Sequence, residues 1–132
     1  MELPKNAKVV EVSAYWTWMG EDGIARTKVK PFANVTLKEA RENTESVDSL
    51  FIGKAFPLLI DSLDIQSMNK EARDHFSVNN RSTCINSFAV VIASPVSRVI
   101  GNFFMGINKP HVPARLFNNE KDALKWLKQF LQ

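Results

Sequence analysis

Cysteine and glycine are both scarce in this chain, and each shortage excludes a class of site. Cys84 is the only cysteine among 132 residues, so an internal disulfide and a cysteine-cluster metal site are excluded, which suits a reducing cytoplasm. We read Cys84 as a buried structural thiol. The five glycines form no Gly-rich phosphate loop, which argues against a Rossmann or P-loop nucleotide site. His75 and His111 lack metal-ligand spacing and are read as surface residues. We therefore expect no metal and no cofactor.

Long apolar runs are also missing. Runs such as "FAVVIA" are far shorter than the roughly 20 residues that a membrane-spanning helix needs. The first residues, "MELPKNAK", lack the basic start and apolar stretch of a signal peptide. We expect a cytoplasmic protein without a membrane span. Its length and ordinary composition, 45% apolar and 23% charged, fit a single domain over 1–132, with 1–7 as a candidate disordered tail.

The charge balance gives little indication of a partner. The chain has 17 basic and 14 acidic side chains, a net charge of +3. Arg26, Lys28 and Lys30 would share one face of a predicted strand, and such a stripe could meet phosphate. A solvated outer face is the favoured reading, and no nucleic-acid partner is expected.

Alternating and apolar segments predict a layered α/β domain. Residues 8–19 and 24–30 alternate around the turn residues "GEDG", which indicates an antiparallel hairpin. The apolar runs 56–61 and 87–93 are typical of strands buried on both faces. The remaining pattern predicts a short strand, "PARLF", and helices that begin with a capping box at Thr36 and Glu39, with Ser67 or Asn69 as cap, with Pro95, and near Asn119. The predicted order β-β-α-β-α-β-α-β-α gives a mostly parallel sheet with the hairpin at its edge.

The helix that begins at Pro95 is expected to present one face to the core. At 100° per residue, its larger apolar side chains fall on a single arc, namely Val96, Val99, Ile100, Phe103, Phe104 and Ile107. Arg98, Asn102 and Met105 share the opposite side, beside Ser97 and Gly101. This outer strip is a candidate partner interface, since Arg and Met are enriched at interfaces, whereas a solvated face is the plainer reading.

Several segments carry a resemblance to a known family. "FPLLID", "KEARDHF", "SPVSRVIGNFF", "NKPHVPARLF" and "ALKWLKQFL" cover most of the chain from Thr36 onward. Together with the element order, they resemble a group of small uncharacterised bacterial proteins of the STAS/SEC14-like type, which have the SpoIIAA-like, or STAS, fold. The resemblance implies a non-enzymatic regulatory module that binds a protein partner, and its SEC14-like side implies an apolar ligand. STAS proteins are often phosphorylated in an Asp-Ser-Ser-Gly-like stretch. Here the comparable residues are "QSMN", so only Ser67 could be the phosphorylated residue.

Polar side chains follow the two central predicted strands, where ligands of open α/β sheets bind. Asp61 and Ser62 end one strand and Ser67 and Asn69 follow it, whereas the other strand leads into Ser94, Ser97 and Arg98. The helix N-terminus with Arg98 could bind an anion. In the alternative reading Ser94 caps the helix and Arg98 pairs with Asp61 or a carbonyl. Both readings stay open at this point.

Two functional hypotheses follow. The first is a regulatory or protein-interaction module of STAS type whose partner binds around Ser67 and the helix after Asn69, extending to Arg98 and Asn102. The second is a sensor of a small ligand or anion near Asp61, Ser94 and Arg98. An enzyme ranks third because no catalytic constellation is present. A homodimer through the hairpin edge or an outer helix strip is a further candidate, since an open sheet leaves edge groups unpaired.

Overall fold

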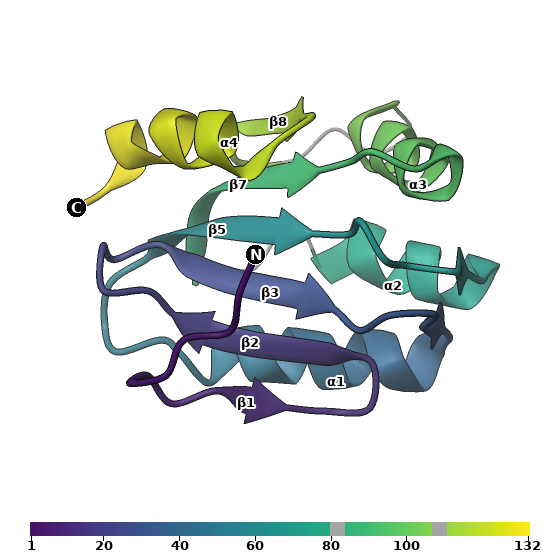
Figure 1. Cartoon of the computed structure of the whole chain (residues 1–132), viewed down its shortest axis with the longest axis horizontal. Coiled ribbons are helices and arrows are strands. Elements are labelled where there is room, and N and C mark those ends of the chain that lie inside the picture. Colours follow the sequence, from purple (N-terminus) through teal and green to yellow (C-terminus); the bar gives the residue numbers. More distant parts are fainter. Residues whose placement is uncertain (80–83, 107–110) are drawn as a thin grey trace.

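The computed structural model, which describes residues 1–79, 84–106 and 111–132, is built on a mixed six-stranded sheet (Figure 1). The strand order is β1-β2-β3-β5-β7-β8, with β1 (Val10–Glu11), β2 (Tyr15–Met19), β3 (Ala25–Val29), β5 (Phe56–Asp61), β7 (Ile85–Val91) and β8 (Ala114–Phe117). The strands from β1 to β3 pair antiparallel, and those from β3 to β8 pair parallel. The predicted mixed sheet with an antiparallel hairpin at one side is confirmed.

A second, two-stranded ladder lies beyond the carboxyl ends of the central strands. It pairs β4 (Asn34–Val35) with β6 (Ser67–Met68) in parallel. The sequence pattern does not indicate this ladder, because two-residue strands are too short to show a periodic pattern.

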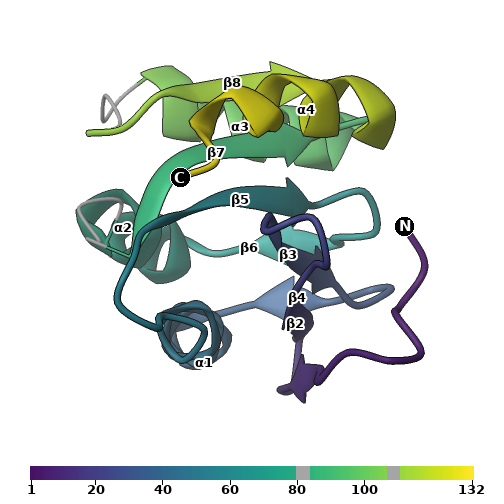
Figure 2. The ribbon, with the colours of Figure 1, turned by 90° about the vertical axis from the view of Figure 1, so that its left-hand side faces the viewer.

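Helices cover both faces of the main sheet (Figure 2). On one face, α1 (Leu37–Asp48) packs beside α2 (Lys70–Asn79). On the other, α4 (Glu120–Leu127), followed by a 3-10 turn (Lys128–Phe130), packs on β5 and β7. The helix α3 (Pro95–Gly106) contacts β8. None of the described helices is long and apolar enough to cross a bilayer.

The central strands are buried on both faces, as their continuous apolar runs predicted. Leu58 and Val90 point toward α1 and share an apolar cluster with Val47. Leu59 points the other way, into a cluster with Leu127 of α4. Each of these five side chains is at most 7% exposed, so the sheet is the middle layer of three.

The predicted helix starts are confirmed in their hydrogen bonds. The Glu39 carboxylate accepts the backbone N–H of Thr36 at 2.8 Å. Asn69 accepts the N–H of Ala72 at 2.9 Å, so Asn69 rather than Ser67 caps α2. Asn119 accepts the N–H of Asp122, also at 2.9 Å. These bonds satisfy N–H groups that a helix leaves free in its first turn.

The predicted core face of α3 is wrong in part. Ile100 is 5% exposed, as expected, but Val96 is 40% and Val99 69% exposed. Ser97 and Gly101, which the helical wheel placed beside the outer strip, are buried instead. A Cβ on Gly101 would lie 3.1 Å from side-chain carbons of Ile92 and Leu116, so the small residues let α3 approach the sheet closely. The side chains of Phe103, Phe104 and Met105, and Ile107 as a whole, lie outside the described residues.

This orientation of α3 predicts unequal costs for two neighbouring truncations. Ile100→Ala should lower the free energy of unfolding by about 2–4 kcal/mol, because it leaves a cavity in the core. Val99→Ala should change it by less than about 0.5 kcal/mol, because the side chain already faces water. Urea denaturation of the two variants measures both values. Equal losses would contradict the orientation.

Candidate functional site

Asp61 and Ser62 end β5 in buried positions. Asp61 is 2% exposed, and its carboxylate lies 3.5 Å from Lys28 Nζ and accepts the backbone N–H of Leu63 at 3.0 Å. Ser62 donates its hydroxyl to the carbonyl oxygen of Val91 at 2.9 Å. Both side chains therefore already hold neighbouring elements together at this end of the sheet.

Ser94 and Ser97 bind one another at the start of α3. The hydroxyl of Ser94 accepts the N–H of Ser97 at 3.0 Å. The hydroxyl of Ser97, which is fully buried, accepts the N–H groups of Ala93 and Ser94 at 3.1 Å each. This reciprocal arrangement has the logic of a capping box with serine in place of glutamate.

Arg98 and Asn102 are exposed on α3. The alternative in which Arg98 pairs with Asp61 or a carbonyl is not seen among the described residues, and the Asp61 carboxylate faces Lys28 instead. Within the described part of the chain, Arg98 has no ion pair or hydrogen bond through its side chain. Its guanidinium is therefore available on the outer surface.

Ser67 and Asn69 lie at a different place, on the small β4–β6 ladder. Ser67 is exposed, and its hydroxyl donates to Asn34 Oδ1 at 2.6 Å. Asn69 is also exposed and caps α2. The structure therefore divides the predicted residues into a buried or partly buried group at the ends of β5 and β7, an exposed pair on α3 and an exposed group at the ladder.

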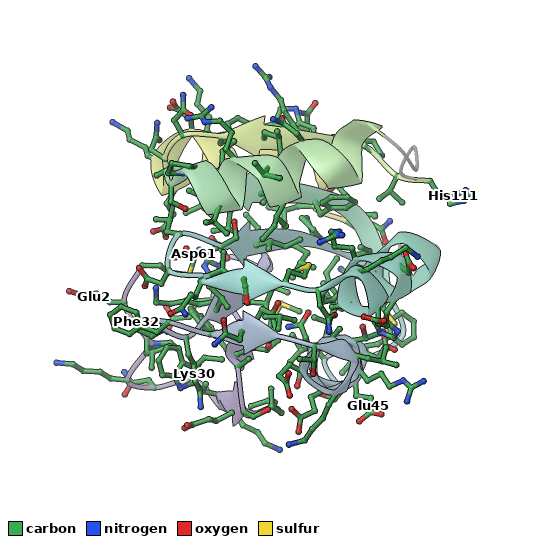
Figure 3. All side chains as sticks on the ribbon, turned by 90° about the vertical axis from the view of Figure 1, so that its right-hand side faces the viewer. Glu2, Lys30, Phe32, Glu45, Asp61 and His111 are labelled. Carbon is green, nitrogen blue, oxygen red and sulfur yellow. The ribbon has the colours of Figure 1, made fainter. Side chains whose placement is uncertain are left out.

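A turn between β3 and β4, not predicted from the sequence, adds an aromatic ring to the exposed group. The backbone carbonyl of Lys30 accepts the N–H of Ala33 at 3.2 Å. This hydrogen bond closes a turn with Pro31 in the second and Phe32 in the third position. Phe32 has a φ of 61°, a value that the third position of a type II turn requires and that glycine or asparagine normally supplies. Its side chain is 80% exposed. Figure 3 looks onto this end of the molecule, where Phe32 and Asp61 are both labelled.

Backbone hydrogen bonds fasten this turn to the segment that carries Ser67. The N–H of Phe32 donates to the carbonyl of Asp64 at 3.1 Å, and the N–H groups of Gln66 and Ser67 both donate to the carbonyl of Ala33. Four of the exposed side chains on these segments form what we call the turn–ladder surface: Phe32, Asn34, Gln66 and Ser67. Glycine or asparagine at the third position normally indicates a type II turn in a sequence. Because phenylalanine stands there instead, the sequence gives no indication of this turn.

Each basic residue of the predicted stripe is paired with acid. Arg26 lies 2.7 Å from Asp22. Lys28 lies between Asp61 and Asp64, at 3.5 and 3.4 Å. Lys30 lies 2.7 Å from Glu11 and stacks over the Trp16 ring at 5.3 Å from its centroid. The hydrogen bond and charge of Lys30 hold the pKa of Glu11 below its usual value. The stripe is thus locally neutralised.

Among residues 1–79, 84–106 and 111–132, no three His, Cys, Asp or Glu side chains gather closely enough to hold a metal ion.

Comparison with known families and curated proteins gives one match. A family model described as Domain of unknown function (DUF7793) matches residues 17–131. No curated protein matches the chain. A solved protein with unknown function from Arthrobacter sp. FB24 is 31% identical, over 84% of this chain and 96% of that one, with a TM-score of 0.33.

Two further solved structures agree in fold. An uncharacterised protein of the DUF3478 family with a SpoIIAA-like fold, from Shewanella loihica PV-4, superposes with a TM-score of 0.59 at 15% identity, over 96% of this chain and 99% of that one. An anti-sigma factor antagonist from Mycobacterium paratuberculosis superposes with a TM-score of 0.63 at 16% identity, over 97% and 99%. The SpoIIAA-like fold expected from the sequence is confirmed.

The serine pair at the start of α3 predicts a structural cost when it is broken. Ser97→Ala should lower the free energy of unfolding by about 1–3 kcal/mol, because two backbone N–H groups lose an acceptor in a partly buried place. Arg98→Ala, one residue further along, should change it by less than about 0.5 kcal/mol. Urea denaturation provides both values, and a neutral Ser97→Ala would rule out the capping role.

Proposed function

Because the chain belongs to the DUF7793 family of domains of unknown function and has the SpoIIAA-like fold, we propose that it is a non-enzymatic regulatory module of STAS type. In this proposal it binds a protein partner through the turn–ladder surface. The similar structure of an anti-sigma factor antagonist supports a regulatory role of this kind, and the partner is therefore sought among regulatory proteins.

Phe32 is the observation that carries the proposal. A bulky residue in the left-handed region costs roughly 1–2 kcal/mol compared with the right-handed one, and the ring gains little burial in return at 80% exposure. Residues held in such conformations cluster at functional sites, where the strain is part of the function. Protein-binding hot spots usually contain an aromatic side chain that becomes buried in the complex and is surrounded by polar contacts.

The surroundings of Phe32 define what a partner must offer. The ring requires an apolar pocket, and the amide and hydroxyl groups of Asn34, Gln66 and Ser67 require hydrogen-bonding groups around that pocket. The surface continues to Asn69 at the start of α2. On α3, Arg98 and Asn102 are exposed beside the apolar Val96 and Val99 and supply a second contact area for a large partner.

Ser67 is the proposed point of regulation. Its hydroxyl is exposed and donates to Asn34, so phosphorylation would replace this donor by a doubly charged group. The same change would place negative charge on the strand that leads into α2, beside the proposed anchor. Phosphorylation would therefore alter the surface in the place where the partner binds.

The anchor role of Phe32 predicts that its removal weakens binding without lowering stability. Phe32→Gly should leave the free energy of unfolding unchanged or raise it by up to about 1 kcal/mol, because glycine adopts positive φ without strain. The same variant should bind a partner at least about 30-fold more weakly, as expected for a hot-spot residue worth 2 kcal/mol or more. Ile52→Ala is the matched control, since Ile52 is an apolar residue that is 93% exposed in the loop before β5.

The partner is first recovered by quantitative capture with the wild-type, Phe32→Gly and Ile52→Ala chains. It is then purified and titrated against all three by calorimetry. Equal affinity for wild type and Phe32→Gly would overturn the anchor role, as would loss of binding in Ile52→Ala alone.

A phosphorylation experiment tests the regulatory role separately. Incubation with cell extract and ATP, followed by mass spectrometry, should place phosphate on Ser67, and Ser67→Glu should weaken partner binding by about tenfold or more, since an unpaired charge in an interface is costly. Ser49→Glu is the control, because Ser49 is also exposed and lies at the C-terminal end of α1, whereas the β4–β6 ladder lies at its N-terminal end. Modification elsewhere than on Ser67 would contradict this role.

A further inference from the structure

A cavity of about 120 Å³ lies between the helices and the main sheet. Its walls come from α1, α2, α3 and the strands β2, β3, β5, β6 and β7. Most of the wall is apolar, and its apolar side chains include Val47, Leu58, Ile65, Phe76, Val90 and Ile100. The cavity is separate from the turn–ladder surface, whose exposed side chains are absent from its walls.

The packing of α2 explains why this space is left open. Its main contacts are with α1 rather than with the strands beneath it. Among residues 70–76 of α2, Ala72 is buried and Phe76 is partly buried. Close-packed interiors leave few voids larger than a water molecule, so an open space of this size beneath a helix is unusual.

Two polar side chains on the wall have unused hydrogen-bonding capacity. Asn43 is 7% exposed and donates its amide to Thr27 Oγ1 at 2.6 Å, but no described residue donates to its carbonyl oxygen. Tyr15 is 5% exposed, and its hydroxyl has no hydrogen bond within the described part of the chain. Every fully enclosed side-chain nitrogen or oxygen there does have a partner. These two groups therefore border accessible space rather than packed protein.

The charges near the cavity argue against an anion. Asp48 and Asp61 both contribute to the wall, and the carboxylate of Asp61 is already engaged by Lys28 and the Leu63 N–H. Burial also raises the pKa of the Tyr15 hydroxyl well above its usual value, so this group stays a neutral donor at physiological pH. A neutral ligand avoids the cost of burying a charge.

From the cavity, its apolar wall and the free groups of Tyr15 and Asn43, we propose that this protein binds a small, neutral, mostly apolar molecule with one hydroxyl or amide group. An engineered apolar cavity of roughly 150 Å³ accepts benzene, so the ligand has about six non-hydrogen atoms. The body of the ligand contacts Val90 and Ile100, and its polar group reaches Tyr15 or Asn43. This inference is independent of the proposed partner surface.

The test uses cyclopentanol, which is neutral and has about six non-hydrogen atoms, and butyrate, an anion of similar size. The chain is labelled at the methyl groups of Ile, Leu and Val and titrated by NMR. Cyclopentanol should cause saturable shifts of the Val90 and Ile100 methyl groups, with a dissociation constant in roughly the millimolar range that the size of the ligand allows. Butyrate should cause no such shifts.

Four variants decide between specific binding and a general solvent effect. Val47→Phe adds a ring to the wall and should abolish the shifts, and if it does not fold, Val90→Ile should weaken binding severalfold by partial filling. Tyr15→Phe removes only a hydroxyl and should weaken binding by about 2- to 10-fold, the range of one hydrogen bond. Phe32→Gly should bind cyclopentanol like wild type, which keeps this inference separate from the partner surface.

Absence of saturable shifts in the wild-type chain would overturn the proposal, as would equal affinity of wild type and a folded Val47→Phe. Unchanged affinity in Tyr15→Phe would overturn the hydrogen bond to Tyr15. In that case Asn43→Leu must bind cyclopentanol more weakly than wild type, or the proposed polar contact is wrong.

Discussion

The structure depends on the parallel pairing of β5 with β3 on one side and β7 on the other. A strand in this position is covered by neighbours along both edges and by helices on both faces, so its side chains are excluded from water on every side. This constraint explains the apolar run of β5 and the position of Asp61. The first polar residue of the run stands where the strand leaves the sheet and meets Lys28 of β3.

The same pairing brings the loops after β3 and β5 to one end of the molecule. There the short β4–β6 ladder joins two loops that are about thirty residues apart in the sequence. The alternation of side chains along this ladder divides two roles between neighbouring residues. Ser67 points to solvent, whereas Met68 is buried and contributes to the wall of the cavity. The proposed partner surface and the proposed ligand cavity are thus separated by a single two-residue strand.

Small residues in α3 allow the helix to pack closely on the sheet, even though one of them is polar. Ser97 and Gly101 face the sheet because neither has a side chain large enough to hold the helix away from Ile92 and Leu116. The hydroxyl of Ser97 finds its partners in the backbone of its own first turn, so its burial leaves no polar group unsatisfied. The consequence is that Val96 and Val99 turn outward and add apolar area to a helix that also exposes Arg98.

The sequence by itself determined the order of the longer elements, the mixed sheet and the helix starts at Thr36 and Asn119, since periodicity and capping are local properties of the chain. It left Ser67 and Asn69 as alternative caps of α2, and the structure selects Asn69. It also indicated Ser67 and Asp61, which follow recognisable apolar runs. Only the tertiary structure decided which face of α3 is buried, because close approach to the sheet favoured small residues over the larger apolar ones that a helical wheel selects. Only the tertiary structure joined Phe32 to Ser67 and left Tyr15 and Asn43 beside open space. Contacts between residues far apart in the chain create these features, and no local pattern records them.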